Sequence, residues 1–199
     1  MNKPKSDDDW LLEHRNFIEC ESTNPILTIL DLGCGRGRDT HHLVQFGQVI
    51  AADLDLGGLK QCTMSVPTCY PVRLDITAPL PFSDNTFDFV LASLSLHYFS
   101  WRDTEKVMQE LIRCLSPQGR GIIRLNSTKD LNYGANSTSV ISNNYFNVGK
   151  KKKRFFDEQD VLRLVKDLHV ENVRELEIDR YNHTKVVWEI LLYAREEFL

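Results

Sequence analysis

The sequence Ile29-Leu30-Asp31-Leu32-Gly33-Cys34-Gly35-Arg36-Gly37-Arg38-Asp39 joins an apolar run to a loop that holds three glycines, and a helical pattern follows over residues 38–46. These features predict a strand, a tight turn and the start of a helix. Glycine suits such a turn because its backbone takes positive φ and lets another group come close. The first N–H groups of a helix also lack intrahelical partners. The sequence therefore predicts a cofactor site in this loop.

Strand and helix patterns alternate along the rest of the chain. The run 173–178 alternates apolar and polar residues, which is typical of an edge strand, whereas 186–193 is nearly continuously apolar, as expected of an interior strand. The alternation predicts an α/β fold with a doubly wound, Rossmann-like and mainly parallel sheet, covered by helices on both faces. Strands are expected at 29–32, 49–52, 70–74, 87–93, 121–126, 173–178 and 186–193, and helices at 10–18, 38–46, 56–65, 104–115 and, capped by Asp157, 158–168.

Length and composition favour one domain. The chain has 199 residues, a formal net charge of -4 and 42% hydrophobic residues, which suits a single sizeable core. Residues 1–9 are polar and charged, so we expect a flexible tail before a single domain over 10–199. Within that domain, 127–154 is polar and longer than an ordinary connection. Its length predicts a long loop or lid.

The cysteines and the hydropathy pattern bear on the compartment. The chain shows no apolar run near the roughly 18 residues that span a bilayer, and no signal-peptide pattern follows its first lysines. The cysteines are odd in number and scattered, which indicates neither a disulfide framework nor a zinc site. We therefore expect a cytoplasmic protein with reduced thiols, without a membrane segment or a metal. The five are Cys20, Cys34, Cys62, Cys69 and Cys114.

Acidic residues stand where the predicted strands end, and ligands of open α/β sheets bind outside those ends. Asp53 lies about 20 residues after the first glycine, where an acid can accept hydrogen bonds from ribose hydroxyls. This spacing indicates a nucleoside cofactor. A dinucleotide fingerprint is Gly-x-Gly-x-x-Gly, but this chain has Arg38 in place of the third glycine. A nicotinamide oxidoreductase is therefore disfavoured.

The motif Asp31-Leu32-Gly33-Cys34-Gly35-Arg36-Gly37 resembles the first motif of class I S-adenosylmethionine-dependent methyltransferases. Arg38-Asp39-Thr40 and Arg154-Phe155-Phe156 resemble the small bacterial-type members akin to tellurite-resistance and thiopurine methyltransferases. The resemblance covers residues 10–195. It implies a seven-stranded sheet whose last strand inserts antiparallel beside the fifth, and S-adenosyl-L-methionine as the cofactor.

The resemblance also implies roles for single residues. The backbone at Gly33 and Gly35 would approach the methionyl part of the cofactor, and Asp53 would bind the ribose. Asp75 would accept a hydrogen bond from the adenine amino group, and Ile76 would cover the ring. Ser93 and Leu94 would line the cleft near the sulfonium, while Cys34 is expected to be a small filler. The predicted cofactor-binding residues are Asp31, Gly33, Cys34, Gly35, Asp53, Leu54, Asp75, Ile76, Ser93 and Leu94.

Methyl transfer from a sulfonium is an in-line displacement, in which the enzyme holds donor and nucleophile at roughly 3 to 3.5 Å. An acceptor that must lose a proton needs a base. His97, just after the fourth strand, is the first candidate for that base, and Tyr133 in the long segment is the second. The alternatives are a structural histidine packed against Tyr98 and Phe99, and an ordinary loop aromatic at Tyr133.

The acceptor is expected to be a small molecule, because residues 127–154 and the helix around Trp10 are not required by the sheet and mix polar and aromatic side chains. Nucleic acid is disfavoured, since Ser93-Leu94-Ser95-Leu96 replaces the Asn/Asp-Pro-Pro-aromatic motif of enzymes that methylate base amines. The run Lys150-Lys151-Lys152-Lys153-Arg154 could contact phosphate or an acidic substrate, but it is more typical of a solvated loop. An RNA or protein methyltransferase and a non-catalytic cofactor-binding domain of the same fold remain open alternatives.

Overall fold

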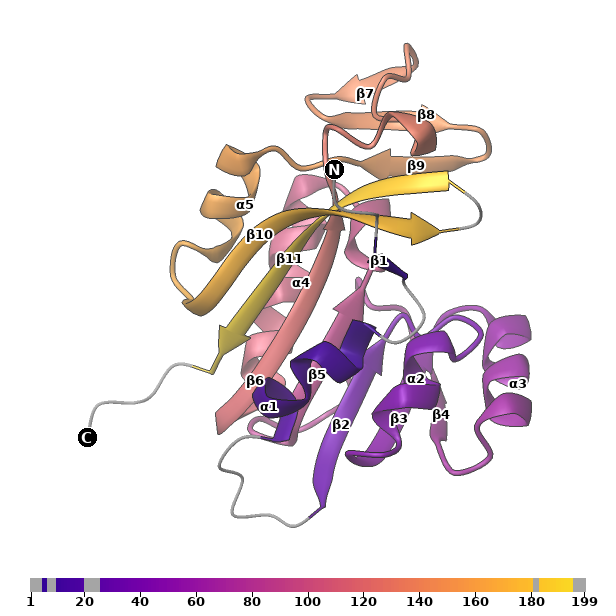
Figure 1. The fold of residues 1–199 in the computed structure, drawn as a ribbon, viewed down its shortest axis with the longest axis vertical. Helices are drawn as coiled ribbons and strands as arrows, with labels where there is room; N and C mark the ends of the chain where they lie inside the picture. The colour runs from indigo at the N-terminus through magenta and orange to yellow at the C-terminus, as the bar shows by residue number, and fades with distance from the viewer. Residues whose placement is uncertain (1–4, 7–9, 20–25, 181–182, 195–199) are drawn as a thin grey trace.

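The main sheet of the computed structural model has the strand order β4-β3-β2-β5-β6-β11-β10, and the two-residue β1 pairs with β10 at the edge (Figure 1). The structure describes residues 5–6, 10–19, 26–180 and 183–194. Neighbouring strands from β4 to β6 are parallel, while β11 is antiparallel to both β6 and β10. The strands are β1 Lys5–Ser6, β2 Leu27–Leu32, β3 Gly47–Asp53, β4 Tyr70–Arg73, β5 Phe87–Ser93, β6 Leu115–Asn126, β10 His169–Arg180 and β11 His183–Tyr193.

This topology confirms the predicted fold class, including the antiparallel insertion of the last strand beside the fifth of the seven longer strands. The apolar run of β11 is buried along most of its length, and β10 is exposed or half-buried at all but one position. The interior and edge positions predicted from the two patterns are therefore correct. Buried parallel strands read as continuous apolar runs, and β5 follows that rule.

Helices cover both faces of the sheet (Figure 1). On one face, Trp10, Leu11, Phe17 and Leu43 pack with sheet residues such as Leu91, so η1, α1 and α2 cover that side. On the other face, residues of α4 and α5 pack with Val90 and Ile190. The helices are η1 Trp10–His14, α1 Arg15–Glu19, α2 Arg38–Leu43, α3 Leu56–Ser65, η2 Leu96–Tyr98, α4 Trp101–Cys114, η3 Leu131–Tyr133 and α5 Glu158–Val165. None in the described ranges is both long and apolar enough to cross a membrane.

The segment 127–154 is not the long loop expected from its polar composition. It contains η3 and an antiparallel sheet of β7 Val140–Ser142, β8 Tyr145–Val148 and β9 Lys151–Arg154, which lies at the carboxyl end of β6 (Figure 1). Tyr145 and Phe146 supply aromatic residues that favour strands, and Gly149 with φ +60° turns the chain between β8 and β9. The chain therefore folds a small second sheet over the edge where ligands bind in this architecture.

Most of the basic run belongs to the strand β9 and not to a loop, although Lys150, Lys151 and Lys152 are exposed as its charge indicated. Arg154 is buried and donates hydrogen bonds to the carbonyls of Phe99 and Asn143, both at 3.3 Å. In the predicted flexible tail, Lys5–Ser6 pairs with β10, and residues 1–4 and 7–9 lie outside the described residues. Four of the five cysteines are free and buried, and Cys20 lies outside the described residues.

Candidate functional site

The glycine loop follows β2 at the middle of the sheet. The amides of Gly33 and Cys34 donate to the carbonyl of Ala52 in β3, at 2.7 and 3.1 Å. Gly33, Gly35 and Gly37 all have positive φ, which glycine adopts without strain. The loop is therefore tied to β3 in a conformation that requires its glycines.

The three glycines have different surroundings. A Cβ at Gly33 would lie 2.3 Å from the Cβ of Ser95, and one at Gly37 would lie 2.6 Å from the sulfur of Cys62. A Cβ at Gly35 would meet nothing within 4 Å. Two of the glycines thus allow close packing inside the protein, whereas the third borders open space that another molecule can enter.

Asp53, at the end of β3, lies directly beside Gly35. One carboxylate oxygen accepts a hydrogen bond from the Gly35 amide at 2.8 Å, and the other accepts from the Asp55 amide at 2.9 Å. Each carboxylate oxygen accepts more than one hydrogen bond, so capacity remains for the hydroxyls of a ligand. The side chain of Leu54 is 55% exposed and adds an apolar surface next to the acid.

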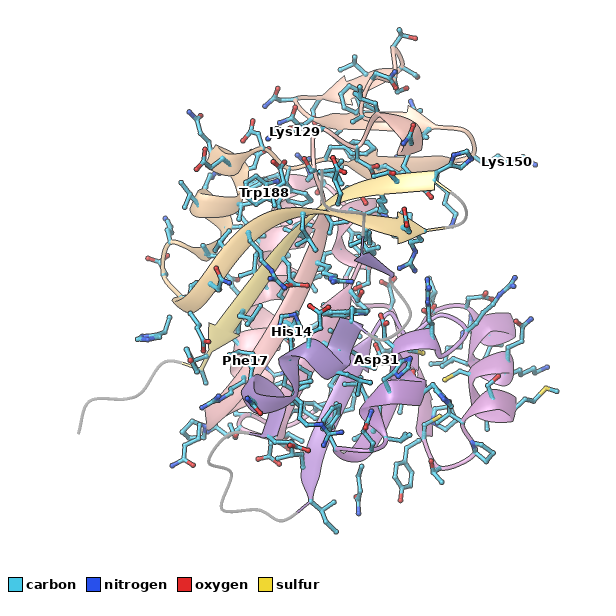
Figure 2. The ribbon with its side chains drawn as sticks, in the orientation of Figure 1. His14, Phe17, Asp31, Lys129, Lys150 and Trp188 are labelled. Carbon is cyan, nitrogen blue, oxygen red and sulfur yellow. The ribbon has the colours of Figure 1, made fainter. Side chains whose placement is uncertain are left out.

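Asp31 is buried below the glycine loop (Figure 2). Its carboxylate accepts a hydrogen bond of 2.6 Å from the Thr40 hydroxyl in α2. Burial, together with the negative charges of Asp39 and Asp53, raises the pKa of Asp31 to about 7. Asp31 therefore fixes α2 to the sheet directly beneath the glycine loop.

Asp75 and Ile76 follow β4, the edge strand beside β3. Asp75 is exposed, and hydrogen bonds from the hydroxyl and amide of Thr77 lower the pKa of its carboxyl. Ile76 is only 8% exposed and packs in the core with Leu74 and Leu80. The acid thus faces solvent near the end of β3, while most of the isoleucine side chain is already covered by the protein.

The chain leaves β5 through Ser93, Leu94 and Ser95. Leu94 has φ +56°, a conformation that is costly for a residue other than glycine. Its amide donates to the carbonyl of Arg124 at 3.0 Å. The hydroxyl oxygens of Ser93 and Ser95 are buried without a hydrogen-bond partner among the described residues. Ser95 also lies against the glycine loop, at the position that a Cβ of Gly33 would occupy.

His97 is buried, and its Nδ1 has no hydrogen-bond partner in the described part of the chain. Its ring lies 4.1 Å from that of Tyr98, between centroids. Burial holds the pKa of His97 well below its usual value, and the charges of Lys185 and Lys153 add to the effect. The imidazole is therefore neutral at pH 7, as a proton acceptor must be.

Tyr133 lies close to the same two lysines. The Lys185 ammonium is 4.3 Å from the centre of its ring, and the Lys153 ammonium is 6.0 Å from it. The Tyr133 hydroxyl donates a hydrogen bond to the carbonyl of Arg180. The structure thus brings His97 and Tyr133 to one group of lysines, although the hydroxyl proton of Tyr133 already serves to join η3 to β10.

Three polar residues of this region were not predicted from the sequence as part of the site. Lys185 in β11 and Asp130 form a buried ion pair, and the buried Asn126 at the end of β6 leaves its side-chain oxygen unpaired among the described residues. Lys185 directly precedes the apolar run 186–193. Its position next to a buried strand is a weak indication that the lysine side chain is buried too. Asp130 stands in a polar segment and carries no comparable signal.

The remaining candidates have simpler environments. Cys34 is buried beside Leu59 and Cys62, and its burial raises the pKa of its thiol far above the usual range. It fills space in the loop and is not a nucleophile. No group of three or more His, Cys, Asp and Glu side chains within the described ranges could hold a metal ion.

Residues 29–119 match the family model described as a methyltransferase domain. The chain is 37% identical over 95 residues to the mitochondrial arginine-hydroxylase NDUFAF5 of Rattus norvegicus, a match that covers 45% of this chain and 26% of that protein. It is 29% identical over 131 residues to the demethylmenaquinone methyltransferase of Symbiobacterium thermophilum, covering 61% and 51% of the two chains. The chain thus spans about a quarter to a half of the length of these relatives.

A solved structure of a SAM-dependent methyltransferase from Methanosarcina mazei has a TM-score of 0.74 and 15% sequence identity, covering 87% of this chain and 95% of that one. The structural match shows a common fold, and the family model covers the glycine loop, Asp53, Asp75 and the loop after β5. Residues 29–119 are therefore similar to a methyltransferase domain, and the chain has the fold of solved S-adenosylmethionine-dependent methyltransferases.

Proposed function

We propose that this chain is an enzyme that transfers the methyl group of S-adenosyl-L-methionine to a small-molecule acceptor. The observation that supports it most directly is the open space in front of Gly35, bordered by Asp53. A nucleoside that enters this space finds a carboxylate with free acceptor capacity at the end of β3, as the ribose of a nucleoside cofactor requires.

The other candidate residues fit the same cofactor. Leu54 offers an exposed apolar surface beside Asp53, so we assign the adenine ring to Leu54 in preference to the largely covered Ile76. Asp75 is an exposed carboxylate with one oxygen that Thr77 does not use. The unpaired hydroxyls of Ser93 and Ser95 lie at the end of β5, where polar groups of the methionyl part can pair with them.

When bound, S-adenosyl-L-methionine supplies an electrophilic methyl group on a sulfonium. The chain's own residues then have to hold an acceptor in line with that methyl group and to exclude water. His97 is neutral and keeps an unpaired ring nitrogen, so it can accept a proton from an acceptor that ionises on transfer. Tyr133 positions η3 through its hydrogen bond to β10.

Binding of the cofactor is tested by calorimetry with S-adenosyl-L-methionine and S-adenosylhomocysteine. Asp53→Asn should weaken binding at least ~10-fold, because a hydrogen bond to a charged group contributes roughly 1.5 to 3 kcal/mol. Asp55→Asn is the matched control: it removes a nearby charge, and asparagine still caps α3. An unmodified chain that fails to bind either compound would contradict the proposed function, and binding of NADH in their place would favour an oxidoreductase.

The transfer itself is tested by the release of S-adenosylhomocysteine over a panel of small acceptors. With a responsive acceptor, His97→Gln should lower kcat and abolish the acidic limb of the pH–rate profile, because the pKa of His97 lies below its usual value. An unchanged profile would leave His97 a structural residue. Cofactor binding without consumption of any acceptor would instead support the non-catalytic alternative.

A further inference from the structure

Four positive charges converge on His97 from segments that are far apart in the sequence. Lys151 and Lys153 come from β9, Lys185 from β11 and Arg180 from the end of β10, and the charge of each lowers the pKa of His97. The small sheet and the two long strands lie next to each other at this edge (Figure 1).

Contacts with two tyrosines fix the lysines around this point. The Lys153 ammonium donates a hydrogen bond of 3.1 Å to the Tyr133 carbonyl, and Lys185 lies over the Tyr133 ring at 4.3 Å. The Lys151 ammonium lies 5.0 Å from the centre of the Tyr98 ring, next to His97. Lys153 and Lys185 are therefore held at Tyr133, and Lys151 is held at Tyr98 beside His97.

The cluster is only partly neutralised from within. Asp130 pairs with Lys185, and both side chains are buried. An ammonium has three donors, and the contact with the Tyr133 carbonyl uses one of those on Lys153. Lys153 is half-buried, and its burial lowers its pKa, so its remaining donors lie in a place where an anionic partner stabilises the charge. The three lysines thus hold more positive charge than Asp130 offsets.

An apolar surface adjoins the lysines. Leu94, Ile178 and Val187 form a buried cluster at the point where the chain leaves β5. Ile178 lies opposite Lys185 in the pairing of β10 with β11, so the apolar cluster and the lysine share one face of the sheet. Buried apolar side chains thus form the base on which Lys185 lies, and the ammonium groups provide the polar part of this region.

From this arrangement we propose that the methyl acceptor is a small organic anion, whose carboxylate or phosphate group is held by Lys151, Lys153 and Lys185 beside His97. The anionic group is the part that is bound, and the methyl group goes to another atom of the same molecule. This inference deepens the proposed function and rests on it. The burial of Lys185 limits the site to a small molecule, because a nucleic-acid backbone is bound along exposed rows of charge.

The test measures binding of a panel of small carboxylates and phosphate monoesters, each paired with its neutral amide or alcohol. Ligand-observed NMR titrations use the protein saturated with S-adenosylhomocysteine, and are repeated without it. Anions should bind at least ~10-fold more tightly than their neutral partners, since charge-assisted hydrogen bonds are the stronger kind.

Two double variants with the same change of charge provide the comparison. Lys151→Gln with Lys153→Gln should weaken anion binding at least ~10-fold, as expected when charged donors are lost. Lys150→Gln with Lys152→Gln changes two exposed lysines that alternate with Lys151 and Lys153 in the sequence. This second double variant should leave anion binding nearly unchanged. Lys185 is left intact because its loss would bury Asp130 unpaired. Melting curves check that both variants are folded.

Three results would overturn the inference: no anion binds, neutral partners bind as well as anions, or both double variants lose binding equally. The last would indicate a general attraction between charges instead of a site. Binding of S-adenosylhomocysteine is measured on the same samples. Its absence would remove the proposed function, whereas its presence without selective anion binding would remove only the inference about the acceptor.

Discussion

Gly35 and Gly37 have the same sign of φ, but the space around them differs, and this difference separates binding from stability. Alanine at either position costs roughly 1 to 2 kcal/mol in the left-handed conformation. At Gly37 the new methyl group also collides with Cys62, whereas at Gly35 it projects into open space. The structure therefore gives Gly37 a packing role, and we propose that Gly35 faces the ligand.

We predict that Gly35→Ala folds with a modest loss of stability and binds S-adenosylhomocysteine at least ~10-fold more weakly, because its methyl group occupies space meant for the cofactor. Gly37→Ala should lose more stability than Gly35→Ala. Both variants place alanine in a left-handed backbone conformation, but only the alanine at 37 also collides with Cys62. Urea denaturation and calorimetry measure the two effects. Equal cofactor affinity in Gly35→Ala and the unmodified chain would contradict the role given to that loop.

Asp31 predicts a dependence of stability on pH. Its pKa is raised from 3.8 in the unfolded chain to about 7 in the folded one. Between these values the folded state binds the proton more tightly, so this residue's contribution to stability is full below pH 3.8 and is lost as the pH rises to 7. One pKa unit corresponds to about 1.4 kcal/mol, so the loss amounts to a few kcal/mol at most.

Asp31→Asn should remove this dependence, because asparagine does not titrate and still offers an oxygen to Thr40. The free energy of unfolding of the variant, relative to the unmodified chain, should rise between pH 4 and pH 8, the range that brackets the two pKa values. Asp55→Asn, at an exposed position, serves as the control. Parallel curves for Asp31→Asn and the unmodified chain would show that Asp31 does not titrate in this range.

Among the secondary-structure elements, η1 is joined to the sheet by one buried carboxylate. Glu189 in β11 is 3.1 Å from Nε2 of His14, 2.7 Å from the guanidinium of Arg124 in β6 and 2.6 Å from that of Arg174 in β10. The Trp10 ring of η1 covers Arg124, and His14 points toward this part of the sheet (Figure 2). Burial opposes ionisation of Glu189, but the hydrogen bond from His14 and the charge of Arg124 hold its pKa at about 2.

We predict that Glu189→Gln lowers the free energy of unfolding by roughly 3 to 5 kcal/mol at pH 7, because it leaves Arg124 buried without its counter-ion. Glu177→Gln, at an exposed position of β10, should change it by less than about 0.5 kcal/mol. In the unmodified chain this contribution is lost as the pH falls from 4.5 to about 2. Urea titrations of the unmodified chain and the two variants measure these free energies of unfolding. Equal values for Glu189→Gln and the unmodified chain would show that Glu189 and Arg124 are solvated.

Over the molecule as a whole, the sequence predicted the strands of the main sheet but not those of the small sheet formed by β7, β8 and β9. Long apolar runs such as Phe87–Ser93 are buried on both faces, so their pattern identifies them. The strands β7 to β9 have three or four residues each and are largely exposed, so they show no apolar period that identifies a strand.

The two parts of the site differ in the same way. The glycine loop and Asp53 lie 18 residues apart and meet because neighbouring parallel strands end at one edge, which spacing alone can predict. Lys185 and Asp130 are separated by 55 residues, and their meeting depends on the antiparallel placement of β11 and on the fold of the segment after β6. No local pattern contains that information, so the meeting of the glycine loop with Asp53 was predictable and the meeting of Lys185 with Asp130 was not.

This division predicts which backbone amides each ligand protects from hydrogen exchange. The amides of Gly33, Cys34 and Gly35 are bonded to β3 or to Asp53, so they exchange only when the loop opens. S-adenosylhomocysteine at a hundred times its Kd adds about 2.7 kcal/mol to the closed state and should slow these amides up to ~100-fold. The amides of β9 should be unaffected by it and slowed by a bound anion. Protection of β9 by S-adenosylhomocysteine alone would mean that the cofactor closes the whole carboxyl edge, and that the two parts of the site do not act separately.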